Sequence, residues 1–324
     1  MRRKIFKMFK VLLAIILVAT IAGSLWNFIC KKIELPKIEA AYGKIVKVKG
    51  RNMVVNCKGE KNDSEPPIVI LPGLGSPSPV LEFEPLANKL SEHYKVIIIE
   101  PFGYGLSDLA ENERSVENIV EELHSCMQAI GISKYYLMGH SISGLYSLYY
   151  ANQYSEEICG FIGIDCSVPK QNENEPFDTG KLNMVSAYLG KIKNMLGISR
   201  LLSLGNAQRA IYADPTYSYS KKELKTFRIL TINNSYNDTV TDELKMVTKN
   251  LKTVRNMKFP ENVPVLNFVS ERNCDIFGDW EELHKEVISN EESSQVVSLN
   301  GGHYLHLECL EEIVLEIREF MNKK

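Results

Sequence analysis

The sequence has almost no net charge and no paired cysteine motif. Its 38 Lys and Arg residues nearly balance 40 Asp and Glu residues, for a formal net charge of −2. It therefore lacks the concentrated basic surface that binding of nucleic acid requires. Its seven cysteines form no C-x-x-C pair and no His/Cys cluster with zinc spacing, so we expect no metal site and no disulfide framework. A content of 44% apolar and 24% charged residues is typical of one large or two modest globular domains.

One long uncharged stretch lies near the N-terminus. Residues 11–29 carry no charge and would form a helix of roughly 28 Å, close to the thickness of a bilayer core. Basic residues are more numerous before this stretch than after it: Arg2, Arg3, Lys4, Lys7 and Lys10 precede it, and Lys31 and Lys32 follow it. This asymmetry predicts a cytoplasmic N-terminus, with the chain from about residue 33 outside the cell membrane.

We interpret residues 1–32 as a basic tail and an uncleaved, single-pass transmembrane anchor. The alternative is a cleaved signal peptide and a secreted protein, because Thr20-Ile21-Ala22 before Gly23 has the small residues of a cleavage site.

The rest of the chain alternates apolar runs with helical patterns. A hairpin is expected at 43–48 and 52–56, and short runs apolar on both faces predict further strands at 68–71, 96–99, 135–138, 161–164, 265–269 and 296–299. Amphipathic helices are expected at 83–93, at 116–130 after an N-cap at Ser115, and at 307–322. This order predicts an α/β fold with a mostly parallel sheet and helices on both faces. Residues 170–260 lack strong strand runs and are expected to be a helical insertion between two core parts, 33–169 and 261–324.

A serine stands at a predicted strand-to-helix turn. Ser141 follows the strand at 135–138 within the sequence Gly-His-Ser-Ile-Ser-Gly of residues 139–144. Such a sharp turn presents the hydroxyl above the sheet and requires small flanking residues. Gly139 meets this requirement on one side, and Ser143 replaces the second glycine. Ser143 is also the alternative nucleophile.

A serine hydroxyl needs a base within hydrogen-bonding reach and a third group to orient that base. The sequence has six histidines. His303 follows the strand at 296–299 in a glycine-containing loop, which favours it as the base. We expect His306 to be packed structurally, His140 to point along the turn, and His93, His124 and His284 to serve no catalytic role.

Four motifs in this order resemble the α/β-hydrolase superfamily: LPGLGS at 71–76, EPFGYGLSD at 100–108, GHSISG at 139–144 and GGHYLHLE at 301–308. The resemblance implies that the backbone N–H groups of Leu74 and Ile142 form an oxyanion hole. It also implies that the insertion at 170–260 is a cap or lid over the site. Chemistry of this kind needs no cofactor.

The acidic residue departs from the usual pattern of this family. Its common position, in the loop 270–275, carries Asn273, which has no negative charge. A second placement one strand earlier resembles the G-L-D-x-x-x-P segment of pancreatic-type lipases and puts Asp165 at a strand end. We favour Asp165 as the acid, with Asp275 and Glu271 as alternatives.

These residues together predict a membrane-anchored serine hydrolase. We expect Ser141 to cleave a carboxylic ester through an acyl-enzyme, with His303 as base and Asp165 as acid. Its partners would be a small, partly apolar ester or amide substrate and, through residues 11–29, the membrane. The alternatives are an amidase or aminopeptidase similar to prolyl iminopeptidases, and a non-catalytic binding protein with this fold.

Overall fold

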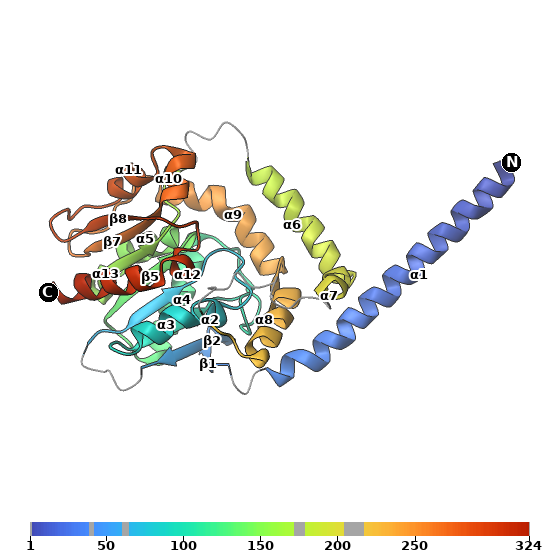
Figure 1. Ribbon diagram of the computed structural model, residues 1–324, viewed down its shortest axis with the longest axis horizontal. Helices are drawn as coiled ribbons and strands as arrows, with labels where there is room; N and C mark the ends of the chain where they lie inside the picture. Colours follow the sequence, from blue (N-terminus) through green and yellow to red (C-terminus); the bar gives the residue numbers. More distant parts are fainter. Residues whose placement is uncertain (1, 39–41, 60–64, 172–178, 204–216, 324) are drawn as a thin grey trace.

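A computed structural model describes residues 2–38, 42–59, 65–171, 179–203 and 217–323. Its centre is an eight-stranded sheet in the order β1-β2-β4-β3-β5-β6-β7-β8 (Figure 1). The pairs β1–β2 and β2–β4 are antiparallel, and all other neighbours are parallel. The strands are β1 (Lys44–Val48), β2 (Arg51–Lys58), β3 (Ile68–Leu71), β4 (Val96–Glu100), β5 (Tyr135–His140), β6 (Ile158–Ile164), β7 (Val265–Ser270) and β8 (Gln295–Leu299). The predicted α/β fold with a mostly parallel sheet is confirmed.

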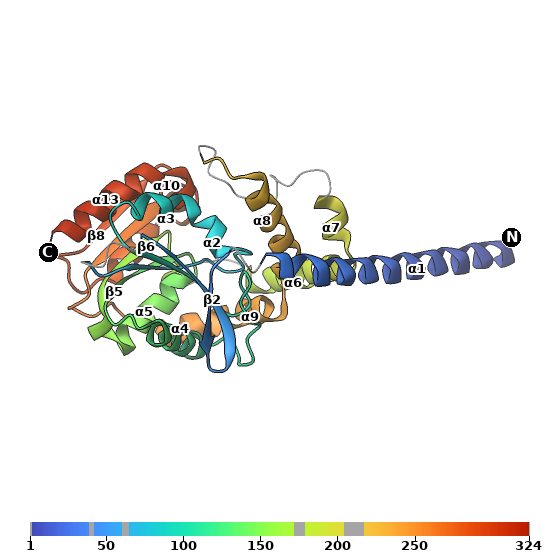
Figure 2. The ribbon, with the colours of Figure 1, turned by 90° about the horizontal axis from the view of Figure 1, so that it is seen from below.

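Helices cover both faces of the sheet, which is why its central strands are apolar throughout. Ile68 and Ile70 of β3 belong to the core layer under one group of helices, whereas Val69 and Leu71 belong to the layer on the other face. The first layer includes α2 (Pro79–Glu82), α3 (Glu84–Leu90) and α13 (Leu310–Asn322), and the second includes α4 (Val116–Ile130), α5 (Ser143–Gln153) and α11 (Trp280–Glu286). Figure 2 shows α3 and α13 on one side of the sheet and α4 and α5 on the other.

Local signals in the sequence explain where the helices begin and end. The Ser115 side chain accepts a hydrogen bond from the Asn118 N–H at the start of α4, and Gly131 ends this helix in the left-handed conformation, with φ +73°. Cys309 divides the helix predicted at 307–322 into α12 (Leu305–Glu308) and α13. Phe83, where another helix was expected to begin, separates α3 from the short helix α2, which was not predicted. The short helices α10 (Glu271–Phe277), η1 (Leu35–Lys37) and η3 (Ser155–Glu157) complete the body.

Among the residues that the structure describes, four helices lie between β6 and β7. They are α6 (Thr179–Met195), α7 (Ile198–Leu202), α8 (Lys221–Asn234) and α9 (Asp238–Val254). Parts of the predicted insertion, residues 172–178 and 204–216, lie outside the described residues. Helix α9 contacts the loops that follow β3 and β4: Thr239 Oγ1 accepts a hydrogen bond of 2.9 Å from the Ala110 N–H, and Val240 lies beside Gly75. These helices therefore cover the carboxyl edge of the parallel strands.

The N-terminal helix α1 (Arg2–Glu34) projects from the body, and its C-terminal half lies beside α7 (Figures 1 and 2). Its most apolar window has a mean hydropathy of 2.3 and is not buried inside the protein. Among the described residues, α1 is the one helix long and apolar enough to cross a membrane.

Candidate active site

Ser141 lies in a sharp turn between β5 and α5. Its φ of +55° is in the left-handed region, which is rare for a residue with a side chain. The turn packs tightly, because a Cβ at Gly144 would lie 2.6 Å from both the Cys166 Cβ and the Ser167 carbonyl oxygen. A hydrogen bond of 3.2 Å from the Ser141 N–H to the Ile164 carbonyl holds the strained residue against β6.

The structure brings Ser141, His303 and Asp165 together from three separate segments. The Ser141 hydroxyl donates to Nε2 of His303 at 2.9 Å, and Nδ1–H of His303 donates to Oδ2 of Asp165 at 2.7 Å. The His303 side chain is 39% exposed, whereas Asp165 is fully buried. The three groups form a continuous hydrogen-bonded chain that ends at an accessible hydroxyl and imidazole.

Asp165 stands at the end of β6 and is surrounded by hydrogen-bond donors. Its Oδ1 accepts from the Ser270 N–H at 3.0 Å and from the Trp280 Nε1–H at 2.8 Å. Burial acts to raise the pKa of Asp165, but the hydrogen bonds from His303, Ser270 and Trp280 outweigh it and the pKa lies below its usual value. The carboxylate therefore stays ionised beside the imidazole.

Helix α10 occupies the place where the family usually carries its acid. Asn273, in this helix, donates from Nδ2 to the same Asp165 oxygen that His303 contacts. The two alternative acids, Glu271 and Asp275, are exposed on α10. The uncharged amide of Asn273 thus adds a hydrogen-bond donor to the Asp165 carboxylate at the end of β6. A second carboxylate at position 273 could not do so, because an ionised carboxylate has no proton to donate.

The loop after β3 lies against the serine turn. A Cβ at Gly73 would lie 3.1 Å from the Ser141 Cβ, and the Ser143 hydroxyl donates to the Pro72 carbonyl. Ser143, the alternative nucleophile, is therefore buried, and its hydroxyl joins the two segments through this hydrogen bond. Leu74 follows in this loop, and Ile142 is buried at the start of α5. The two predicted oxyanion donors are in adjacent segments that meet at Ser141.

Three buried titratable residues behind His303 were not predicted to take part in the site. His140 donates from Nε2 to the His303 carbonyl at 3.0 Å, and its ring centroid lies 4.8 Å from that of His303. Glu82 Oε1 lies 3.7 Å from Nε2 of His306. Burial raises the pKa of Glu82 to about 7 and, with the nearby His303, lowers the pKa of His140 to about 3. The sequence contains no signal for this layer, because Glu82 resembles an exposed helical residue.

A second buried acid links the helices over the site to the loop after β3. The Tyr104 hydroxyl donates to Glu243 Oε2 at 2.9 Å and accepts from the Gly75 N–H at 3.1 Å. The Tyr146 hydroxyl donates to the other oxygen of Glu243 at 2.7 Å. Glu243 belongs to α9, so this helix helps to hold the residue that follows Leu74.

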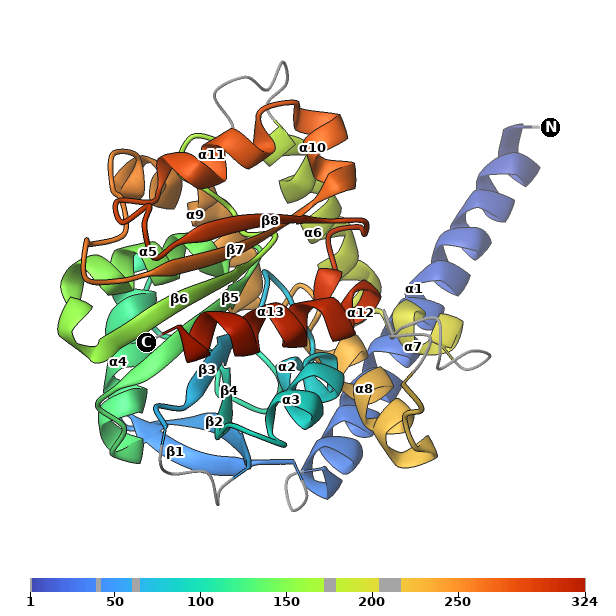
Figure 3. The ribbon, with the colours of Figure 1, turned by 60° about the vertical axis from the view of Figure 1, so that its left-hand side comes forward.

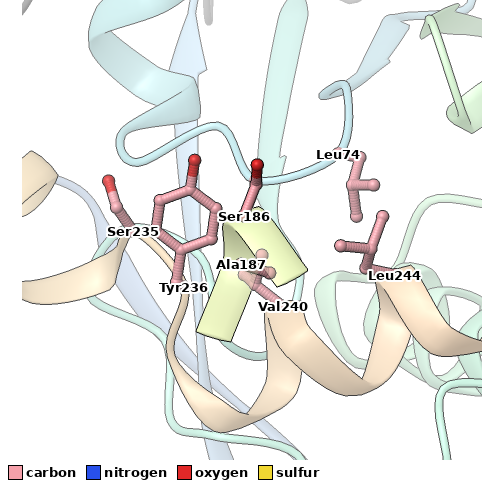
Figure 4. Close-up of a pocket in the computed structure, with 8 residues that line it drawn as sticks. Leu74, Ser186, Ala187, Ser235, Tyr236, Val240 and Leu244 are labelled. Atoms are coloured by element: carbon pink, nitrogen blue, oxygen red, sulfur yellow. The ribbon is translucent and has the colours of Figure 1, made fainter. Parts of the chain in front are cut away.

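A cavity of about 360 Å³ opens beside Leu74 (Figure 4). Its walls come from the loop after β3 and from the helices over the site. Leu74, Val240 and Leu244 give one part of it an apolar lining, and Ser186, Ser235 and Tyr236 bring hydroxyl groups to another part. The cavity therefore suits a partly apolar ligand.

Comparison with known proteins agrees with this architecture. A family profile described as alpha/beta hydrolase fold matches residues 66–196. The chain is 25% identical to the uncharacterized protein YbdG of Bacillus subtilis over 99% of each chain. It is similar to the enol-lactonase of Burkholderia xenovorans, with a TM-score of 0.62, 17% identity and coverage of 86% of this chain and 100% of that one. It is also similar to an epoxide hydrolase of Bacillus megaterium, with a TM-score of 0.66, 14% identity and the same coverage.

The fold, the serine turn and the profile match define the class of this protein. The chain has the α/β-hydrolase fold, and the profile of that description matches its residues 66–196. The solved structures with this architecture include proteins named as an enol-lactonase and as an epoxide hydrolase.

Proposed function

We propose that this chain is a serine hydrolase that cleaves a carboxylic ester. The observation that carries the proposal is the hydrogen-bonded chain from Ser141 through His303 to Asp165, with donor–acceptor distances of 2.9 and 2.7 Å. The same arrangement of a serine, a histidine and a carboxylate performs acyl transfer on several unrelated folds.

The mechanism follows from these contacts. Ser141 Oγ attacks the carbonyl carbon while Nε2 of His303 takes its proton, and the carbonyl oxygen becomes an oxyanion that accepts from the backbone N–H groups of Leu74 and Ile142. The intermediate then expels the alcohol, which receives the proton from His303, and an acyl-enzyme remains. A water molecule, deprotonated by His303, attacks the acyl carbon and releases the acid and the free serine. Asp165 holds Nδ1–H of His303 and stabilises the imidazolium, and each oxyanion donor contributes about 3–4 kcal/mol.

The substrate is an ester with a partly apolar acyl group. The cavity beside Leu74 supports this part of the proposal, because it adjoins the proposed oxyanion loop and is lined in part by Val240 and Leu244. We propose residues 170–260 as a cap domain over a core made of residues 33–169 and 261–324. A panel of chromogenic esters of increasing chain length, set against aminoacyl amides, would separate an esterase from an aminopeptidase-like amidase.

We further propose that residues 11–29 anchor the enzyme in the cell membrane with its catalytic domain outside. The length of α1 and the basic residues before it support this orientation. A membrane fraction washed with carbonate at high pH tests the anchor: an uncleaved anchor stays with the lipid, whereas a secreted form is released.

A fluorophosphonate probe tests the catalytic assignment. The wild-type chain should be labelled, and Ser141→Ala should lose the label because the only activated hydroxyl is gone. Ser143→Ala is the matched control and should keep the label. A folded wild-type protein that takes no label would contradict the proposal and favour a non-catalytic binding protein.

A further inference from the structure

Large apolar side chains are exposed along one side of α6 and α7. Val185, Leu189, Ile192 and Met195 recur at helical spacing, and each is more than half exposed. Leu201 and Leu202 of α7 are also more than half exposed, at 61% and 71%. We call these six residues the cap face. A continuous exposed apolar surface of this kind marks a contact with a membrane or a protein.

The opposite side of α6 packs on the body. Ala187 and Gly190 are buried, and a Cβ at Gly190 would lie 2.4 Å from the Tyr236 ring. Helix α6 contacts α9 through this side. The α6 residues of the cap face therefore lie on the side of this helix away from α9, and α6 lies between α9 and the region into which α1 projects (Figure 1).

The junction of α6 and α7 is fastened to α1. Arg200 is buried and donates to Glu34 at 2.6 Å and to the Asn27 side-chain oxygen at 3.1 Å. The Asn27 amide in turn donates to the Asn194 carbonyl at 2.9 Å. Three polar contacts thus hold the two elements in one arrangement.

Small residues bring the two backbones close together. A Cβ at Gly23 would lie 2.4 Å from the Leu196 carbonyl oxygen, and one at Gly197 would lie 2.7 Å from the Gly23 carbonyl oxygen. Close approach at glycine is typical of helix packing in membranes.

The contact points determine the depth of the cap face along α1. Gly23 precedes Ile29, the last residue of the uncharged stretch, by six residues. At about 1.5 Å per residue this is about 9 Å, so the junction of α6 and α7 is level with the outer part of the proposed membrane span. Arg200 bonds both Asn27, near the end of that span, and Glu34, beyond it, so its guanidinium is level with the outer end of the span.

A third element lies on the same side of the molecule. Helix α10 is near the N-terminal end of α6 in Figures 1 and 3, and it exposes Ile276 and Phe277. Helix α6 itself runs crosswise to α1 (Figure 1). If α1 crosses a membrane, α6 therefore runs along its surface.

From this geometry we propose that the cap face inserts into the outer leaflet of the membrane beside α1. The inference rests on the proposed anchor and adds a second membrane contact to it. The cavity takes Ser186 and Ala187 from α6, so it lies directly behind the inserted helix. The substrate class is therefore an ester whose acyl chain resides in the leaflet and reaches Ser141 without passing through water.

Tryptophan quenching in vesicles tests the insertion. Full-length protein is reconstituted in vesicles of phosphatidylcholine and phosphatidylglycerol, with and without brominated acyl chains. Trp26 in α1 reports the anchor and should be quenched, whereas the buried Trp280, which donates to Asp165, should give an unquenched background in every variant. Leu189→Trp should add quenched emission, whereas Leu315→Trp, at an exposed position on α13, should add unquenched emission.

The outcomes separate the two proposals. Quenched Trp26 with an unquenched tryptophan at position 189 would overturn the insertion and leave the anchor standing. Unquenched Trp26 would overturn both. Crosslinking of position 189 to a second copy of the chain in place of lipid would also overturn the insertion.

A pair of charge variants tests the consequence for catalysis. Leu189→Glu should reduce the rate on a long-chain ester embedded in vesicles by about tenfold, because a carboxylate resists transfer into the leaflet. Its rate on a short soluble ester should be unchanged, which distinguishes failure of insertion from failure of the active site. Leu315→Glu should alter neither rate. Equal rates of Leu189→Glu and wild type on the embedded ester would contradict the proposal.

Discussion

Asp165 combines full burial with a positive φ of +43° and a shell of hydrogen-bond donors. These features belong together: the unusual backbone conformation directs the carboxylate toward His303, and the donors replace the water lost on burial. An isosteric amide could not satisfy the same shell, because its NH₂ group would face another donor.

Asp165→Asn should therefore lower kcat by about 10⁴-fold, since His303 would lose its orienting acceptor and the partner of its positive charge. Ser141→Ala should cost more, about 10⁶-fold. Asp275→Asn is the matched control, an exposed acid on α10, and should leave kcat unchanged. Steady-state kinetics on a soluble ester provide the measurement, and a larger loss in Asp275→Asn than in Asp165→Asn would reverse the assignment.

Glu82 makes stability depend on pH. Burial raises its pKa from 4.5 to about 7, although the Ser76 hydroxyl, donating at 2.5 Å, opposes the shift. Between these two values the folded chain keeps a proton that the unfolded chain has lost. The contribution of Glu82 is therefore present below about pH 4.5 and decreases as the pH rises to about 7.

Glu82→Gln should flatten this dependence, because the amide resembles the protonated acid and keeps an acceptor for Ser76. In wild type, Glu82 should contribute a decrease of up to about 3 kcal/mol in the free energy of unfolding between pH 5 and pH 7. Glu82→Gln should lack this contribution. Glu100, whose pKa burial also raises to about 7, should preserve part of the slope. Denaturant titrations in detergent at both pH values test this, with exposed Glu311→Gln as control. A slope identical to wild type would exclude Glu82 as the source.

At the scale of elements, α9 and the loop after β3 are linked by Tyr104, which bonds both Glu243 and the Gly75 N–H. Tyr146, in α5, donates to the other oxygen of the same carboxylate. Comparing a phenylalanine variant of each tyrosine therefore separates the effect of losing a hydrogen bond to Glu243 from the effect of losing the hydrogen bond to the Gly75 N–H.

Tyr104→Phe should lower kcat about tenfold with little change in KM, because a mobile Gly75 loosens the oxyanion donor at Leu74, which acts mainly in the transition state. Tyr146→Phe should have a similar cost in stability and a much smaller effect on kcat. Kinetics and thermal unfolding of both variants are the measurements. Equal losses of kcat would show that the tyrosines act only through Glu243.

The elements differ in how far the sequence predicts them. All eight strands coincide with predicted strands: the hairpin pattern indicates β1 and β2, and short apolar runs indicate the other six. The division at Cys309 was not predicted, since helical periodicity continues across it, and α2 was not predicted, since its four residues are too few to show a period. The order of motifs places Ser141 and His303 at one edge of the sheet, whereas Glu82 and Glu243 resemble exposed helical acids. Their burial depends on partners far away in the chain, so no local pattern indicates it.

On the scale of the whole molecule, Arg200 joins α7 to α1 through hydrogen bonds to Asn27 and Glu34. This guanidinium is 2% exposed, and Glu34 provides its carboxylate partner. A buried cation that loses its partner is left without solvation, which costs free energy. The Arg200–Glu34 pair should therefore fix α7 against α1 more firmly than an exposed ion pair would.

Glu34→Ala should therefore loosen α7 from α1 and lower the free energy of unfolding by about 1–2 kcal/mol, a value reduced by the partial exposure of Glu34. Amide hydrogen exchange of the full-length protein in detergent should become faster in the peptide that spans residues 194–203, and the region around Ser141 should be unchanged. Lys249→Ala removes an exposed ion pair with Glu113 and should alter neither property. Unchanged exchange in Glu34→Ala would mean that the close contact at Gly23 and Gly197 alone is sufficient to hold α7 beside α1.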